Sequence, residues 1–101
     1  MTKDEARRIL DLVCSGFLDV VFSGHFWMRV DERLPGFTRT QVLQVLRTGE
    51  VRDEPVPDDR HGNHKVRVRA SIPDAGQVEI VLAIAWFDNA IAVTIYSIRG
   101  K

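Results

Sequence analysis

A histidine and two arginines at helical spacing are the first residues of chemical interest in this chain. His25, Arg29 and Arg33 are each four positions apart, so in a helix they would form one ridge. A histidine can move a proton near neutral pH, and an arginine can offset charge that develops at phosphorus. The alternative is a solvated helix face on which the arginines pair with Asp31 or Glu32.

A second group of basic residues alternates along a predicted strand. Lys65, Arg67 and Arg69 occupy every other position and would therefore point to the same side of a sheet. Such a stripe can hold a phosphodiester backbone, because phosphate contacts position a nucleic acid without reading its sequence. Basic residues on an exposed strand can equally serve only to discourage pairing with other strands.

Two residues of the last predicted strand, Thr94 and Tyr96, face the same side as that stripe. A tyrosine there can stack on a base or hydrogen-bond a phosphate, or it can be a half-buried packing residue with its hydroxyl in water.

Metal and cofactor chemistry have weak support in the sequence. His61 and His64 are close, but no second pair of ligands stands at zinc spacing, so no metal site is expected. Cys14 is the only cysteine, so an internal disulfide is excluded and an inert, partly buried thiol is expected. No glycine-rich phosphate loop or dinucleotide motif is present, so no cofactor is expected.

Three helices are predicted in the first half of the chain. Apolar residues recur at helical spacing over 3–13, and Ser23 is the expected cap of a second helix over 24–33. Thr38 and Gln41 have the spacing of a capping box for a third helix, which should end at Gly49. Residues 19–22 are predicted to be an extended link or a short strand.

The second half of the chain changes to a period of two, which predicts strands. Three strands, over 64–70, 77–86 and 90–98, should form an antiparallel meander, with a fourth drawn from 50–55 and a surface loop over 53–62. The expected fold class is α+β, with N-terminal helices packed on one face of a three- to four-stranded antiparallel sheet. Residues 1–101 are expected to form a single domain.

The charge balance limits the partners that the chain can attract. Its 101 residues include 14 Lys and Arg and 14 Asp and Glu, so no global positive field would hold nucleic acid.

No apolar run approaches the roughly 20 residues of a membrane span, and the charged start does not look like a signal peptide. We therefore expect a cytoplasmic protein with no membrane association.

The order of several short motifs resembles that of the small bacterial proteins catalogued as the DUF4258 family. The residues that carry the resemblance are Phe22-Ser23-Gly24-His25, Arg29, Glu32-Arg33, Gln41-Val42, Gly49-Glu50-Val51 and Ile91-Ala92-Val93-Thr94-Ile95-Tyr96. The match spans roughly residues 20 to 98. The layout that it implies, helices before an antiparallel sheet, is similar to that of RelE-like toxins, which cleave RNA without a metal through Arg, Lys, His and Tyr side chains.

The resemblance implies a metal-independent endoribonuclease of the toxin type. It gives His25, Arg29, Arg33 and Tyr96 as the expected catalytic residues and Thr94 as an expected substrate-binding residue. The basic stripe alone adds Lys65, Arg67 and Arg69 to the expected substrate-binding residues. RNA and an antitoxin or other protein would be its partners. Such toxins are typically strongly basic and this chain is neutral, which also suits a non-catalytic module that binds a protein or nucleic acid through the open sheet face. A toxin-derived fold without activity is the third interpretation.

Overall fold

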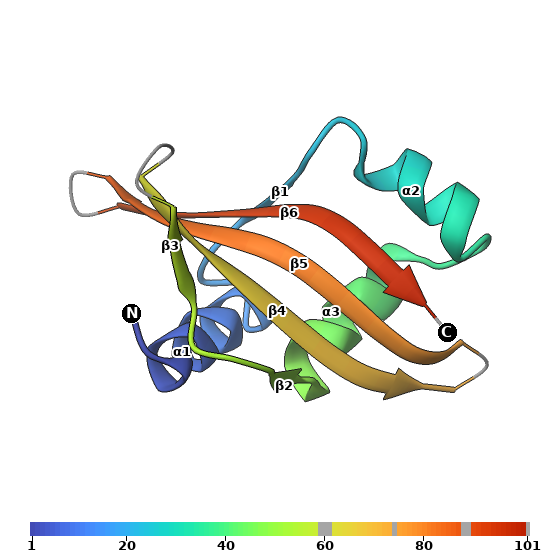
Figure 1. Ribbon diagram of the computed structural model, residues 1–101, viewed down its shortest axis with the longest axis horizontal. Coiled ribbons are helices and arrows are strands. Elements are labelled where there is room, and N and C mark those ends of the chain that lie inside the picture. Colours follow the sequence, from blue (N-terminus) through green and yellow to red (C-terminus); the bar gives the residue numbers. More distant parts are fainter. Residues whose placement is uncertain (59–61, 74, 88–89, 101) are drawn as a thin grey trace.

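The computed structural model describes residues 1–58, 62–73, 75–87 and 90–100, with the side chains of 86 and 87 left aside. In this part of the chain three helices and six strands follow one another (Figure 1). They are α1 (Lys3–Cys14), β1 (Val20–Phe22), α2 (Phe26–Arg33), α3 (Arg39–Thr48), β2 (Glu50–Val51), β3 (Val56–Asp58), β4 (Asn63–Ile72), β5 (Gly76–Phe87) and β6 (Ala90–Gly100). The α+β class predicted from the sequence is confirmed.

The sheet is larger than predicted and is not wholly antiparallel. Its described strands run in the order β1-β6-β5-β4-β2, and β3 also pairs with β4. The meander β4-β5-β6 is confirmed, as is the short strand β2, which pairs antiparallel with β4. By contrast, β1 lies parallel to β6, with Val20 opposite Val93. The expected count of three or four strands was therefore too low.

The region predicted as a loop over 53–62 contains the strand β3. Val56 pairs with Lys65 and Asp58 with Asn63, so this segment continues the edge of β4 beyond β2. Proline is tolerated in an edge strand because its missing N–H can face away from the ladder, and Pro57 occupies such a strand. Residues 59–61, which include His61, and residues 88–89 of the predicted last turn lie outside the described residues.

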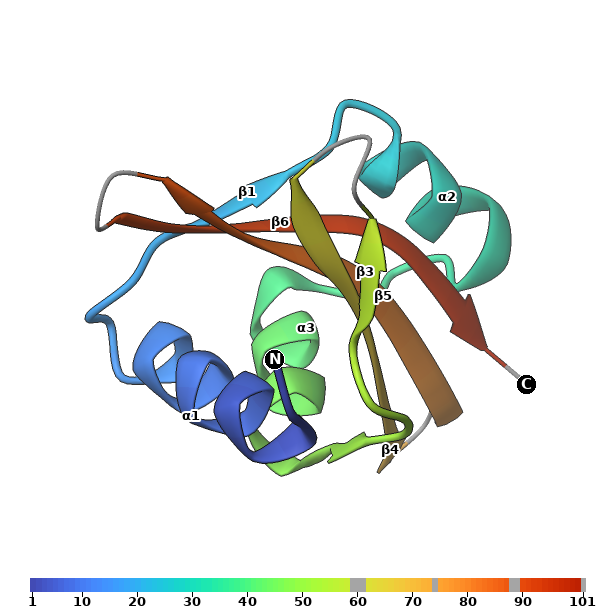
Figure 2. The same ribbon diagram turned by 60° about the vertical axis from the view of Figure 1, so that its left-hand side comes forward.

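The long strands bury one face against the helices. Val66 and Val68 of β4 are buried, as the period of two predicted, and Ala70 is partly buried. The strand also extends beyond its predicted end to Ile72, which is buried as well. Figure 2 shows α1 and α3 together under the sheet, and α2 apart from them beside β6. All three helices contribute to one apolar core, α2 through Phe26 and Val30. No described helix has the length and apolarity needed to cross a membrane.

A bulge interrupts the pairing of β5 with β6. Val81 pairs with Ser97 and Leu82 with Ile95, so Tyr96 is an extra residue on β6. One extra residue reverses which side the following side chains face. Ile98 is therefore buried in the core, where uninterrupted alternation from Ile95 would have placed Ser97.

The predicted helix ends were partly right. Thr38 caps α3 and forms a reciprocal capping box with Gln41, and Gly49 follows the last turn, as expected. The prediction that Ser23 caps the second helix was wrong, because His25 occupies that position without a side-chain cap hydrogen bond. The Ser23 hydroxyl instead donates to the Tyr96 carbonyl at 3.4 Å and ties the start of α2 to β6.

Arg7 fastens α1 to the end of α3. Its guanidinium donates to the Leu46 carbonyl and, at 3.0 Å, to the Gly49 carbonyl, and its Nε donates to Asp11 at 3.1 Å. The last carbonyls of a helix have no partner within the helix, and a cation there also complements the helix dipole. This contact sets the position of Gly49, where the chain leaves α3 and enters β2.

Gly49 is required by space rather than by backbone angle. Its φ is −75°, but a Cβ at this position would meet the Val45 carbonyl, Val68 Cγ1 at 2.6 Å and the Arg69 carbonyl at 3.0 Å. Two of these neighbours are backbone atoms that cannot move without shifting α3 or β4. A side chain therefore does not fit between the helix and the sheet.

We predict that Gly49→Ala lowers the free energy of unfolding by about 1–3 kcal/mol, the usual cost of overpacking. Gly24→Ala is the matched control, because a Cβ at Gly24 meets nothing within 4 Å. Urea unfolding followed by circular dichroism measures both variants. Equal stability of the two would contradict the close approach of α3 and β4.

Candidate functional site

The face of the sheet turned away from α1 and α3 carries the basic stripe and is called the open face below. Lys65 and Arg67 are exposed and Arg69 is half-buried, while the intervening Val66 and Val68 are buried. The sequence prediction for these five residues is therefore confirmed. By register, the described side chains of the open face are those of Val21, Glu50, Val56, Asp58, Asn63, Lys65, Arg67, Arg69, Ser71, Gln77, Glu79, Val81, Ala83, Ala85, Ala90, Ala92, Thr94, Tyr96, Ser97 and Arg99.

Each cation of the stripe has a carboxylate beside it. Arg67 Nη2 lies 2.8 Å from Asp53 Oδ2, and Arg69 Nη2 lies 2.9 Å from Glu79 Oε2. Lys65 Nζ lies 3.9 Å from Asp58 Oδ2. The stripe is therefore a set of ion pairs rather than a row of unpaired positive charges.

The pairing of these acids with the stripe was not predicted from the sequence. Asp53 and Asp58 belong to the segment that was predicted as a loop, so they had no predicted place beside β4. Glu79 lies on the open face opposite Arg69 and is 8% exposed. Alternation along the strand predicts that Glu79 faces this side, because Ile80 faces the core. Only the pairing of β4 with β5 shows that Glu79 lies beside Arg69.

The middle of the open face is lower than its surroundings. Ala83 and Ala85 are only 3% and 9% exposed, since longer side chains such as Lys65 and Thr94 stand on the neighbouring strands at the level of Ala83. Ala83 and Ala85 therefore offer little exposed apolar surface of their own.

A hollow of about 260 Å³ lies on this face and is lined by Asp58, Lys65, Val81 and Tyr96. Lys65 and Tyr96 stand on the strands on either side of Val81, which lies on β5. An ammonium group, a carboxylate and a phenol thus surround an apolar floor.

The residues predicted on the second helix form a separate group. His25 is exposed at the start of α2, and together with Met28, Arg29 and Glu32 it lines its own hollow of about 260 Å³. This hollow shares no lining residue with the hollow on the open face. The strand β1, which leads to His25, is three strands away from β4, about 14 Å at the ordinary spacing. The structure thus keeps His25 and Arg29 apart from Lys65 and Arg67.

Arg33 has a different position from its two predicted partners. Its guanidinium donates to the Ile98 carbonyl at 2.9 Å and to Ser97 Oγ at 3.2 Å. These acceptors belong to the part of β6 beyond its pairing with β1, so Arg33 covers a sheet edge that would otherwise present bare backbone. This contact attaches α2 to the sheet.

We predict that Arg33→Ala lowers the free energy of unfolding by about 1–2 kcal/mol, because the Ile98 carbonyl loses a charged donor. Arg29→Ala is the control on the same helix, since the structure gives the Arg29 side chain no hydrogen bond or ion pair among the described residues. Its expected change is within about 0.5 kcal/mol. Urea unfolding of both variants measures the difference, and equal losses would argue against an edge-covering role for Arg33.

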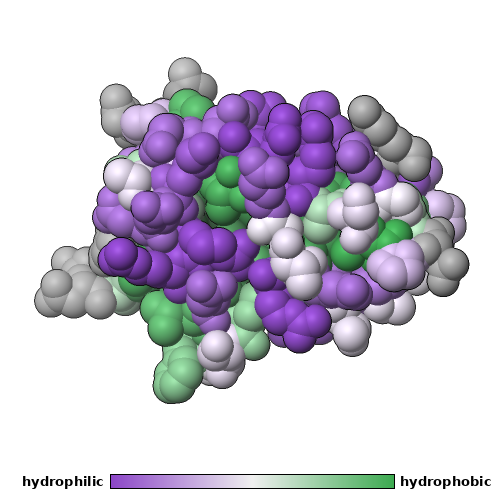
Figure 3. Space-filling model, turned by 90° about the horizontal axis from the view of Figure 1, so that it is seen from below, coloured by the Kyte–Doolittle hydropathy of each residue, from purple (hydrophilic) through white to green (hydrophobic). Residues whose placement is uncertain are grey.

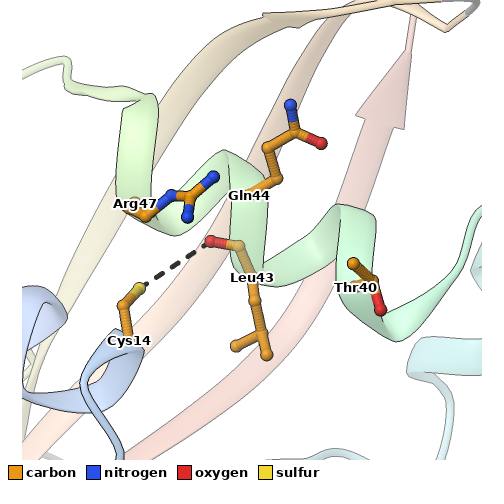
Figure 4. A pocket seen from close by; sticks show the side chains of 5 residues that line it. All are labelled: Cys14, Thr40, Leu43, Gln44 and Arg47. Atoms are coloured by element: carbon orange, nitrogen blue, oxygen red, sulfur yellow. Dashed lines mark hydrogen bonds between the residues drawn. The ribbon is translucent and has the colours of Figure 1, made fainter.

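The one cysteine lies in a hollow of about 240 Å³ between α1 and α3, lined also by Thr40, Leu43, Gln44 and Arg47 (Figure 4). Its thiol points to α3 and donates to the Leu43 carbonyl at 3.7 Å. Burial raises the pKa of the Cys14 thiol, because the thiolate loses hydration. The expectation of an inert, partly buried thiol agrees with this environment.

We predict that alkylation of Cys14 by iodoacetamide follows a pH profile displaced upward from that of free cysteine. The physical reason is that only the thiolate reacts and burial disfavours it. The same chain unfolded in urea should return to the ordinary profile. A native profile at or below that of free cysteine would show that the thiol is activated.

The surface on the side of α1, α3 and β2 gives less indication of a site. Seen from this side, it is mostly hydrophilic, and hydrophobic side chains show in separate small groups (Figure 3). Among the described residues, no three His, Cys, Asp or Glu side chains gather as metal ligands would.

Comparison with known proteins finds no matching family model, curated protein or solved structure. The resemblance to the DUF4258 proteins and the RelE-like layout therefore stay predictions.

Proposed function

We propose that this chain is a non-catalytic binding module that presents the open face of its sheet to a protein partner. One observation carries the proposal: Lys65, Arg67 and Arg69 each have a carboxylate of the same chain beside them. A protein partner has charges of both signs and can match such a face, whereas a nucleic acid offers only negative charge along its backbone.

Paired cations are poor ligands for a phosphodiester backbone. Affinity for nucleic acid comes largely from cations that replace counterions at phosphates. Arg67 would have to exchange Asp53 for a phosphate, and the released carboxylate would remain close to the new anion. The charge balance of the whole chain, 14 basic and 14 acidic residues, adds no attraction at longer range.

The centre of the open face has the composition of a protein-binding surface. Tyrosine is enriched among the interface residues that contribute most of the binding energy, and Tyr96 lines the hollow whose floor is Val81. Val21 and Val56 lie at opposite sides of the same face and are 62% and 59% exposed. Tyr96 and Val81 thus supply apolar contact near the ion pairs, and Val21 and Val56 supply it at the two sides of the face.

The metal-independent endoribonuclease remains an alternative prediction with less support. It requires a proton-transfer group and phosphate-binding cations to reach one substrate. His25 and Arg29 line one hollow, and Lys65 and Tyr96 line another. Arg33, in turn, is engaged with the edge of β6.

The proposal predicts that a photo-reactive amino acid at Val56 of the full chain captures a protein in the native host cells. Leu12, 41% exposed on α1, is the matched control position and should yield no such adduct. The adduct should survive treatment with ribonuclease. An adduct that ribonuclease removes would show that the partner is RNA rather than a protein. Equal adducts from Val56 and Leu12 would show that the open face has no special role in binding.

A parallel assay tests the absence of catalysis. The wild-type chain should leave RNA intact and should not arrest growth when it is produced alone. Cleavage or arrest by the wild type that is lost in both His25→Ala and Arg29→Ala would overturn the proposal in favour of the endoribonuclease.

A further inference from the structure

We infer that the protein partner of the open face is a second copy of this chain, bound face to face about a two-fold axis. This inference rests on the proposed function and specifies its partner. Its basis is a row of four charged residues whose order is complementary to itself.

The row crosses the sheet from β2 to β6. Glu50 pairs with Arg69, Arg69 with Glu79, and Glu79 with Arg99, each on an adjacent strand. Cα partners in a ladder project to the same side of the sheet, so all four side chains belong to the open face. The charges along the row are negative, positive, negative and positive.

Consider a two-fold axis that lies between the two sheets, parallel to the strands and midway between β4 and β5. Rotation about this axis places the row over the same row of the second copy, in reverse order. Glu50 then faces Arg99 of the second copy, and Arg69 faces the second copy's Glu79. In an isologous interface residue i meets j and j meets i, so the favourable contact at one end is repeated at the other. A row with an odd number of alternating charges would set like charges against each other at its ends.

The neighbouring rows fit the same axis. Arg67 pairs with Val81 and Lys65 with Ala83 within the sheet, so the rotation sets Arg67 over the second copy's Val81 and Lys65 over its Ala83. No cation of β4 faces another cation. The aliphatic stems of Lys65 and Arg67 can cover these small apolar residues while their charged ends stay hydrated.

The exposure of these four side chains in a single chain is consistent with a surface whose binding partner is absent. Glu79 is held by Arg69 at 2.9 Å and is 8% exposed, whereas Glu50 and Arg99 at the two ends are exposed. The row spans four adjacent strands, about 14 Å at the ordinary strand spacing, so its two ends lie far enough apart to fix how a second copy is oriented.

The test is a charge exchange between the two ends of the row, measured by sedimentation equilibrium of the full chain. The wild type should dimerise. Glu50→Arg and Arg99→Glu should each raise the dimer dissociation constant by at least about tenfold, because like charges then face each other. The double variant Glu50→Arg/Arg99→Glu should restore it to within about threefold of the wild type, since opposite charges meet again.

The double variant distinguishes charge contacts between two copies from ion pairs within a single chain. Within one chain it puts a second positive charge beside Arg69 and a second negative charge beside Glu79, so intramolecular repulsion persists in both places. Recovery of association therefore requires contact between copies. Glu32→Arg on α2 and Arg47→Glu on α3 are controls with the same changes of charge at exposed sites away from the open face, and they should not alter the dissociation constant.

A wild type that stays monomeric at every concentration overturns the inference, whether or not the variants fold. A dimer that tolerates both single exchanges, or a double variant as weak as the singles combined, overturns it as well. If the wild type is monomeric and the photo-reactive group at Val56 still captures a different protein, the proposed function stands and only the second copy is wrong. If the wild type is monomeric and Val56 captures nothing, both fail.

Discussion

Side chains alternate between the two faces of a strand, and this constraint in β4 determines how the rest of the molecule is built. Val66 and Val68 face the helices, so Lys65 and Arg67 must face the other way. A slip of one residue would place the valines in water and the cations in the core. The helices α1 and α3 can cover only the branched face, and the charged face is left for other contacts.

The charged face is organised from three parts of the chain. Asp53 comes from the connection after β2, Asp58 from β3 and Glu79 from β5, and all three lie close to cations of β4. An exposed pair such as Arg67 with Asp53 adds little to stability, but it cancels the local field. The more buried pair of Arg69 with Glu79 fixes the guanidinium, so this arginine is positioned before any partner arrives.

The sequence predicts those features of the fold that depend on near neighbours in the chain. The capping box of Thr38 and Gln41 and the alternation of β4 are local, and both were found in advance. The parallel pairing of β1 with β6 joins Val20 to Val93, and no local pattern indicates such a partner. The strand β3 was missed because Pro55 and Pro57 are typical of loops, although an edge strand accepts proline.

The candidate site was harder to predict for the same reason. Spacing grouped His25, Arg29 and Arg33, but the long-range hydrogen bond from Arg33 to Ile98 assigns that arginine to the sheet edge. Spacing likewise indicated the basic stripe but not its carboxylate partners, which come from other segments, such as Asp53, 14 residues from Arg67. Side-chain type and face could be predicted, but the partner of each charge required the tertiary structure.

The neutralisation of Lys65, Arg67 and Arg69 by carboxylates of the same chain is tested most directly by the salt dependence of RNA binding. A fluorescent single-stranded RNA is titrated with the wild-type chain over a range of salt concentrations. We predict binding too weak to measure, or a dissociation constant that hardly changes with salt. A slope of log K against log salt of about −2, the value for three phosphates on a single strand, would show that Lys65, Arg67 and Arg69 are available to a polyanion and would contradict the account.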